Sequence, residues 1–207
     1  MAGVLIAQLS DLHVGGARFD AELLRTAVEE IADAEPDLVV VAGDLTEDGY
    51  PDEQEAAAGA LDPLQGIRPV PVSRERLGGL DVALVGVDSS KPDLDEGEVG
   101  RERRDAGDVL ALLNRRRVDL VLGGHRHVPW VWPLAGMLIV NSGTVSTYRA
   151  RGFRRPAYNL SRVDRETIDV ELRVPGGERR SVVVYPRAWP AGLARSPDVL
   201  EAGPTPG

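Results

Sequence analysis

The histidines of this chain are few and gathered in two short stretches. The 207-residue sequence has three of them, His13 in "SDLHVG" and His125 and His127 in "GGHRH". Two aspartates accompany them, Asp11 in the first stretch and Asp44 in "VVAGDLTEDG". Carboxylates and neutral imidazoles together form an oxygen and nitrogen ligand set that suits Mn²⁺, Fe²⁺/Fe³⁺ or Zn²⁺. Cysteine is absent, which excludes disulfides and thiolate metal sites.

Each of these stretches has an ordinary explanation when it is taken alone. A D-x-H triplet fits a turn aspartate beside a surface histidine, Gly-Asp is a common turn, and tandem histidines fit a solvated loop. Their combination is more informative, because each stretch follows a short apolar run with the character of a strand. If the stretches meet in space, a shared carboxylate could bridge two cations at roughly 3.5–4 Å, the spacing used for phosphoryl chemistry.

Strands and helices must alternate along the chain to bring these residues together. Short apolar runs predict four buried strands, at 4–9, 37–44, 81–90 and 118–125. Helical periodicity is found between them, at 19–36, 51–62 and 105–116. This alternation indicates a largely parallel sheet, whose carboxyl ends would carry the polar residues at one edge. After residue 137, short strands with turn signals indicate an antiparallel meander.

Composition limits the domain organisation and the function classes. We expect one domain over residues 1–186 and a flexible tail rich in Pro, Gly and Ala over residues 187–207. No apolar run is long enough to span a membrane, and the N-terminal residues lack the basic region of a signal peptide, so a cytoplasmic location is expected. The net charge of −9 argues against general nucleic-acid binding.

Three segments, taken in order, resemble the calcineurin-like metallophosphoesterases over about residues 3 to 165. They are "SDLHVG", "VVAGDLTEDG" and "LVLGGHRHVPWVWPLAGMLIVNSGTVS". The resemblance implies an α/β sandwich of two mixed β-sheets flanked by helices, with a dinuclear metal site at one edge. It places Asp11, His13, Asp44 and His127 around the first metal, with Asp44 bridging to a second metal that His125 binds. The implied activity is hydrolysis of a phosphomonoester or phosphodiester by a metal-activated water.

The chain departs from the pattern of that family in two places. The family has a G-N-H-D or G-N-H-E motif, whose asparagine binds the second metal and whose histidine acts on the leaving group. Here "SRERLGGL" (73–80) stands where that motif is expected, and a later H-H motif is also missing, since no histidine is left unassigned. Both gaps resemble loop deletions. The leaving-group residue is therefore unknown, and the second metal site is expected to be impaired.

Two functional classes remain open at this point. The first is a metallophosphoesterase, a hydrolase acting on ester bonds, with one well-formed metal site and weak turnover or none. The second is a catalytically inactive metal-binding or scaffold protein on the same fold. The ratio of bound metal to protein, measured beside activity, would distinguish these classes.

Further residues beyond the three motifs could contribute to function. Arg149 and Arg151 in "STYRARGFRRP" predict an electropositive rim that guides the phosphoester substrate, although a solvated turn explains them as well. Trp130 and Trp132 alternate along a strand-like run, and packing against a neighbouring element is favoured over base stacking. Shortened loops would leave apolar sheet edges open, which favours a homo-oligomer.

Overall fold

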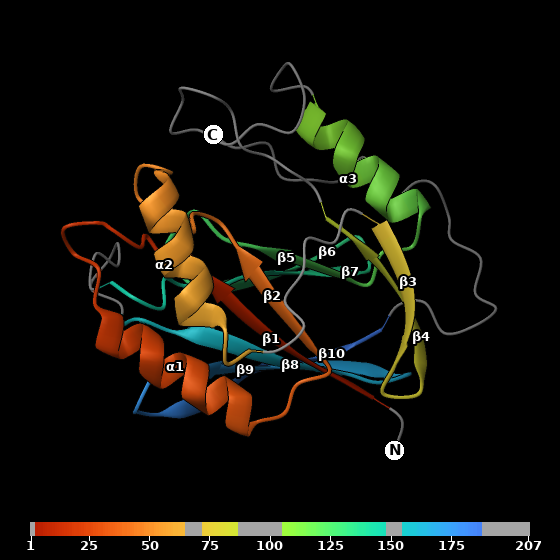
Figure 1. The fold of residues 1–207 in the computed structure, drawn as a ribbon. Coiled ribbons are helices and arrows are strands. Elements are labelled where there is room, and N and C mark those ends of the chain that lie inside the picture. Colours follow the sequence, from red (N-terminus) through yellow and green to blue (C-terminus); the bar gives the residue numbers. More distant parts are fainter. Residues whose placement is uncertain (1–2, 65–71, 87–104, 148–154, 188–207) are drawn as a thin grey trace.

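A computed structural model describes residues 3–64, 72–86, 105–147 and 155–187. Figure 1 shows two sheets lying face to face, with α1 (Ala21–Asp33) and α2 (Pro51–Leu61) over one of them and α3 (Asp105–Arg115) over the other. No helix in these ranges is long and apolar enough to cross a membrane. The predicted tail falls almost wholly on 188–207, outside the described residues, and its first residue, Arg187, donates to the carboxylate of Asp119.

The larger sheet has five strands and carries the first two motifs. Its strands, in spatial order, are β10 (Arg179–Pro186), β9 (Thr167–Arg173), β8 (Tyr158–Val163), β1 (Val4–Ser10) and β2 (Leu38–Ala42). β1 and β2 pair in parallel, while β1 with β8, β8 with β9 and β9 with β10 pair antiparallel. The parallel pair brings the ends of β1 and β2 to the same edge of the sheet.

The smaller sheet has three strands and carries the tandem histidines. Its order is β5 (Leu120–Gly123), β7 (Met137–Asn141) and β6 (Trp130–Leu134), with β5 parallel to β7 and β6 antiparallel to it. β3 (Val72–Leu77) and β4 (Leu80–Val85) form a separate antiparallel hairpin.

The prediction of one largely parallel sheet is therefore wrong in its pairing. Of the four strands expected there, β1 and β2 pair with each other, whereas β4 and β5 belong to the hairpin and to the smaller sheet. The antiparallel meander is confirmed for β8, β9 and β10 but not for β7, which joins β5 and β6. A strand's own apolar pattern does not determine which other strand it pairs with, and β2, β4 and β5 are half-buried or partly exposed rather than buried. The fold class itself, an α/β sandwich of two mixed sheets with flanking helices, is confirmed.

The first helix forms where the sequence predicts it, and its apolar face packs into the larger hydrophobic cluster. The carboxylate of Asp20 accepts the backbone N–H groups of Glu22 and Leu23 at 3.0 and 3.1 Å, and so caps the N-terminus. Its buried side chains recur at helical spacing: Leu24, Ala27, Val28 and Ile31. They pack with Leu9 and Leu12 in a cluster that also includes Ala57 of α2.

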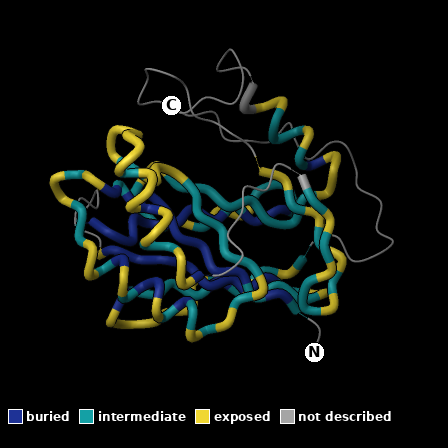
Figure 2. The backbone as a smooth tube through the Cα atoms, in the orientation of Figure 1, coloured by how far each residue is buried: buried dark blue, intermediate teal, exposed yellow. Residues whose placement is uncertain are grey.

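A second cluster lies between the two sheets. Leu138 and Val140 of β7 meet Ile168 and Val170 of β9, and these four side chains are the buried centre of the interface. Figure 2 shows the buried backbone concentrated in the central strands, while the helices and outer loops are more exposed. Because the larger sheet is covered on both faces, its buried strand β1, which lies between β8 and β2, has a fixed position from which the first motif emerges.

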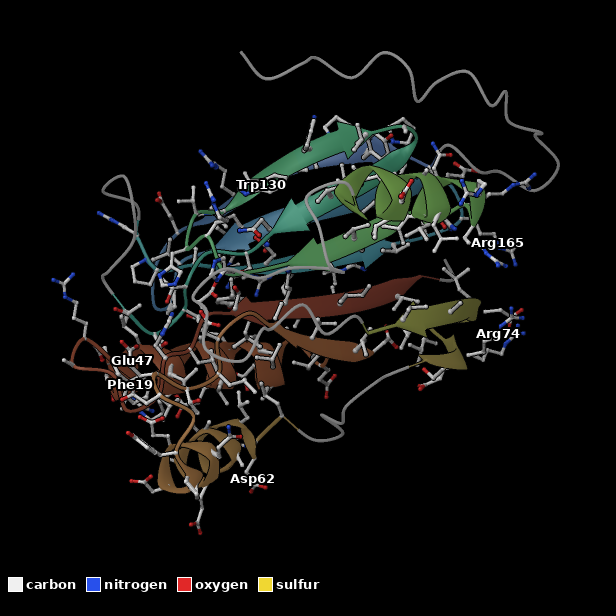
Figure 3. The ribbon with its side chains drawn as sticks, turned by 90° about the horizontal axis from the view of Figure 1, so that it is seen from above. Phe19, Glu47, Asp62, Arg74, Trp130 and Arg165 are labelled. Atoms are coloured by element: carbon white, nitrogen blue, oxygen red, sulfur yellow. The ribbon has the colours of Figure 1, made fainter. Side chains whose placement is uncertain are left out.

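The two tryptophans of β6 point away from this interface. Trp130 and Trp132 are 38% and 47% exposed, and their rings contact each other with centroids 6.4 Å apart. Figure 3 labels Trp130 on the side-chain view of this sheet. Val131 between them faces the inner cluster, so the two indoles lie on the outer side of this sheet, and the expected packing against a neighbouring element is not seen among the described residues.

Candidate metal centre

The loop after β1 is held in an unusual backbone conformation. Asp11 and His13 both have positive φ angles, 53° and 47°, in the left-handed region that non-glycine residues rarely adopt. Each such residue costs about 1–3 kcal/mol, so the conformation persists only where neighbouring contacts enforce it. The N–H of Asp11 donates to the backbone carbonyl of Ala42 at 3.1 Å, and the N–H of His13 donates to the backbone carbonyl of Asp44 at 3.2 Å. The pairing of the two parallel strands thus continues into the site.

Hydroxyl groups from the segment after β7 support the same loop from below. Thr144 Oγ1 donates to the carbonyl of Asp11 at 2.8 Å, and Ser146 Oγ donates to the carbonyl of Leu12. Both hydroxyl residues are fully buried. Sequence reasoning did not assign them a role. The available signal was the alternation of hydroxyl side chains in "NSGTVS", in which Asn141 also donates to the carbonyl of Val128 and so anchors the histidine loop.

The tandem histidines enter from the smaller sheet, also on left-handed backbone. The φ angles of His125 and His127 are 71° and 56°. The N–H of His125 donates to Asp11 Oδ1 at 2.7 Å, and the N–H of Asp44 lies 3.4 Å from the same oxygen. Ser10 Oγ donates to the other oxygen of that carboxylate. The buried carboxylate of Asp11 therefore ties all three motifs together.

Two glycines allow the three segments to approach each other. A Cβ on Gly43 would lie 2.2 Å from Asp11 Oδ1, and a Cβ on Gly124 would lie 2.3 Å from Ser10 Oγ. Gly43 also has a φ angle of 74°. The "GD" and "GGH" glycines are needed because a side chain at either position would separate the strand ends.

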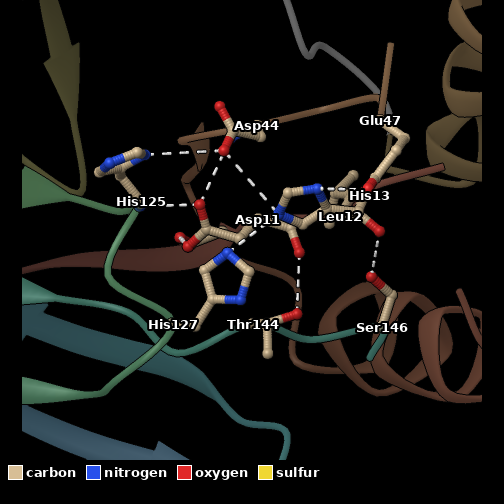
Figure 4. Close-up of polar contacts among 10 residues, drawn as sticks. Asp11, Leu12, His13, Asp44, Glu47, His125, His127, Thr144 and Ser146 are labelled. Atoms are coloured by element: carbon tan, nitrogen blue, oxygen red, sulfur yellow. Dashed lines mark hydrogen bonds and ion pairs between the residues drawn. The ribbon is translucent and has the colours of Figure 1, made fainter. Parts of the chain in front are cut away.

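Four of the predicted metal-binding side chains converge at this edge. Asp11, His13, Asp44 and His127 each offer one ligand atom, and these four atoms lie within 4.8 Å of one another. The Nε2 atoms of the two histidines are 2.9 Å apart, with ring centroids at 4.8 Å, and His13 Nε2 lies 3.8 Å from Asp44 Oδ2. Figure 4 shows this arrangement.

The donor set fits a divalent cation. Ligand atoms on opposite sides of a cation, with bonds of about 2.0–2.2 Å, are about 4.0–4.4 Å apart. The observed spacing is close to that value, so small side-chain rotations would let all four donors surround one ion. Two carboxylates and two imidazoles suit Zn²⁺, Mn²⁺ or iron.

The fifth predicted ligand lies to one side of this group. His125 Nδ1 is 3.7 Å from Asp44 Oδ2, and both side chains are about half exposed. Asp44 thus faces His13 on one side and His125 on the other, as a bridging carboxylate would. Within the part of the chain that the structure describes, Asp44 and His125 are the two groups in position to hold a second ion.

The hairpin that replaces the missing motif points away from the centre. A Cβ on Gly78, in the turn between β3 and β4, would lie 1.8 Å from the carbonyl oxygen of Gly3, just before β1 begins. The predicted metal ligands of the first motif follow the other end of β1, which is seven residues further on. At about 3.3 Å per residue, the turn and the ligands are separated by roughly 20 Å. The turn therefore supplies no ligand to the centre.

A further carboxylate and a small hollow border the centre. Glu47 Oε2 lies 2.9 Å from His13 Nδ1, a contact that the sequence motifs did not indicate. A hollow of about 260 Å³ adjoins these two residues, and its other lining residues are Gly16, Ala17, Arg18, Phe19 and Thr147. Arg149 and Arg151, predicted to bind substrate, lie outside the described residues, so that prediction stays a prediction.

The chain is similar to known proteins over most of its length. The probable metallophosphoesterase of Methanothermobacter thermautotrophicus is 28% identical over 175 residues, which cover 82% of this chain and 91% of that protein. A conserved uncharacterized protein of Streptococcus pneumoniae TIGR4, described as a predicted phosphoesterase, superposes with a TM-score of 0.53 at 18% identity. That match covers 88% of this chain and 99% of the other.

A Vps29 single mutant from Entamoeba histolytica is similar to a comparable degree. Its TM-score is 0.52 at 17% identity, with 86% of this chain and 99% of that chain covered. Identities this low show a shared fold alone. Residues 4–164, however, match the calcineurin-like phosphoesterase superfamily domain, and this is most of the chain. The chain belongs to the calcineurin-like phosphoesterase superfamily.

Proposed function

We propose that this protein is a metal-dependent hydrolase of phosphomonoesters or phosphodiesters with an impaired second metal site. The observation that carries the proposal is the convergence of Asp11, His13, Asp44 and His127 from three separate segments. These four residues would hold the first ion. A divalent ion there would lower the pKa of a bound water and polarise a phosphoryl oxygen.

The protein's own residues divide the remaining work. Asp11 is held by backbone donors and fixes the geometry, whereas Asp44 is exposed and faces the open side where substrate would enter. The hollow beside His13 would receive the organic part of a small substrate, and Arg18 in its lining offers a positive charge to an anionic group.

The second half of the centre limits the rate. Asp44 and His125 alone would hold a second ion weakly unless the substrate phosphate completed its coordination. The sequence also lacks the motif histidine that acts on the leaving group, and a positioned acid of this kind typically contributes about 10²–10⁴ in rate. We therefore expect slow turnover. Mn²⁺ is the ion we would supply first, and a cytoplasmic location stays a prediction.

Metal content and hydrolysis, measured together, test the proposal. Purified protein loaded with Mn²⁺ and assayed on bis(p-nitrophenyl) phosphate is expected to bind about one ion per chain and to turn over slowly. Asp44→Asn should abolish the activity, while Glu29→Gln on the exposed face of α1 should leave it unchanged. Two tightly bound ions with efficient turnover would contradict the impaired second site.

One specific observation favours the alternative of an inactive metal-binding or scaffold protein. The family's second-metal motif is expected to reach the metal centre. The hairpin that stands in its place in the sequence has its turn far from that centre. If the protein binds one ion and shows no hydrolysis of phosphomonoester or phosphodiester, this alternative replaces the enzyme.

A further inference from the structure

The contact between Glu47 and His13 is built by the backbone. Beyond the last paired residues of β1 and β2, Val14 and Thr46 form an isolated parallel bridge. The N–H of Val14 donates to the backbone carbonyl of Leu45 at 3.1 Å, and the N–H of Glu47 donates to the backbone carbonyl of Val14 at 3.0 Å. These bonds place Glu47 directly beside the histidine of the first motif. The position of Glu47 is therefore set by the same strand extension that positions His13.

The side chains complete the contact in a partly buried setting. The carboxylate oxygen Oε2 lies 2.9 Å from His13 Nδ1, with the two side chains 34% and 15% exposed. Nδ1 itself is buried, and the contact has the distance of an ion pair without the alignment of a hydrogen bond, so this nitrogen has no hydrogen-bond partner. A small rotation of the carboxylate would supply one.

Gly16 leaves the room that this carboxylate occupies. A Cβ at Gly16 would lie 2.8 Å from Glu47 Oε2, and the N–H of Gly16 donates to the carbonyl of His13 at 3.0 Å. The loop after the first motif thus turns back over His13 and lets Glu47 reach the ring from the side opposite the metal ligands. Glu47 is not among the four converging donors.

We propose that Glu47 is a positioning residue for His13. Its carboxylate accepts the Nδ1–H of the ring, which fixes the tautomer and aims the unprotonated Nε2 at the cation. The hydrogen bond made by one ring nitrogen decides which nitrogen is free to bind metal, and a carboxylate partner also makes the ligand more basic. This inference rests on the proposed metal centre but does not require turnover.

Metal affinity, measured without substrate, tests the role. The probe is Zn²⁺, titrated against a competing chelator in the wild-type chain and in three variants. Glu47→Ala is expected to weaken binding about 10–100-fold, the usual effect of losing such a partner. Glu47→Gln, whose amide oxygen can still accept the Nδ1–H, should recover most of the affinity. Asp48→Asn removes the same charge one residue further along and should change affinity less than about twofold.

A nuclear magnetic resonance experiment reads the tautomer directly. Only three histidines contribute ring signals, so long-range ¹H–¹⁵N spectra of the Zn²⁺-loaded protein can be assigned by single substitutions. In the wild-type chain and in Glu47→Gln, His13 should show a slowly exchanging Nδ1 proton. In Glu47→Ala that proton should exchange rapidly.

The results separate this inference from the proposed function. If Glu47→Ala binds Zn²⁺ as tightly as the wild-type chain, or if Glu47→Gln is as weak as Glu47→Ala, the positioning role is overturned while the hydrolase proposal stands. If the wild-type chain binds Zn²⁺ but hydrolyses nothing, the hydrolase proposal fails and the positioning role is still decided by the variants. A wild-type chain that binds no metal overturns both.

Discussion

Asp11 and Asp44 follow neighbouring parallel strands, yet they stand in different surroundings. Asp11 is fully buried, and its carboxylate receives donors from Ser10, Asp44 and His125. The side chain of Asp44 is 48% exposed, and its carboxylate lies 3.8 and 3.7 Å from the imidazoles of His13 and His125. Asp11 therefore holds the three motifs together, while the carboxylate of Asp44 is accessible to a ligand.

This difference explains how the chain could keep the proposed first metal site while the proposed second site weakens. The first site is held by strand pairing, buried hydroxyl groups and backbone donors, which also support the fold. The proposed second site consists of Asp44 and His125, whose side chains are about half exposed. We therefore expect substitutions at the proposed second site to cost the fold little, whereas loss of Asp11 would disturb both the fold and the proposed first site.

The largest effect is expected when the buried aspartate is removed. Asp11→Ala leaves the N–H groups of His125 and Asp44 without their acceptor, so the free energy of unfolding should fall by about 2–4 kcal/mol and metal binding should be lost. Asp44→Ala should also weaken metal binding but change the unfolding free energy by less than about 0.5 kcal/mol. Urea unfolding of the two variants in metal-free form measures both unfolding free energies. Equal losses of stability would break the comparison between the two aspartates.

A pair of glycines gives a smaller and sharper test. Gly43 and Gly49 both have positive φ angles, 74° and 80°. A Cβ at Gly43 would meet Asp11 Oδ1 at 2.2 Å, but a Cβ at Gly49 would meet nothing within 4 Å. Gly49→Ala should therefore cost only the backbone penalty, about 1 kcal/mol. Gly43→Ala should cost about 1–3 kcal/mol more. Thermal unfolding compares the two, and similar shifts would show that close approach at Gly43 is unimportant.

The smallest effect is expected at the exposed histidine. His125→Ala removes a side chain that lies outside the group of four donors, so the affinity for the first ion should change less than about threefold and the unfolding free energy less than about 0.5 kcal/mol. His127→Ala, two residues away, removes a proposed ligand and should weaken that affinity by more than about 100-fold. Calorimetric titration with Zn²⁺ measures both, and equal losses would place His125 in the first site.

Local features were predictable because they depend on neighbours in the chain. The cap at Asp20 and the buried face of α1 follow from residue types at helical spacing, and both are found as expected. The segments that carry the proposed ligands were predictable for a similar reason, since polar residues at the carboxyl ends of strands gather at a sheet edge. The contacts of Thr144 and Glu47 were not, because their partners lie 133 and 34 positions away in the chain.

The sequence by itself determined the kinds of ligand available, the number of histidines and most of the segments that become strands or helices, although of the four strands predicted to be buried only β1 is buried and β4 alternates half-buried and exposed residues. Only the tertiary structure decided which strands pair, that β4 leaves the main sheet, and that four donors meet while a fifth stands aside. The physical reason is the distance along the chain between the residues that interact. Periodicity records which side of an element is apolar, but pairing and close approach depend on shapes and donors contributed by distant parts of the chain.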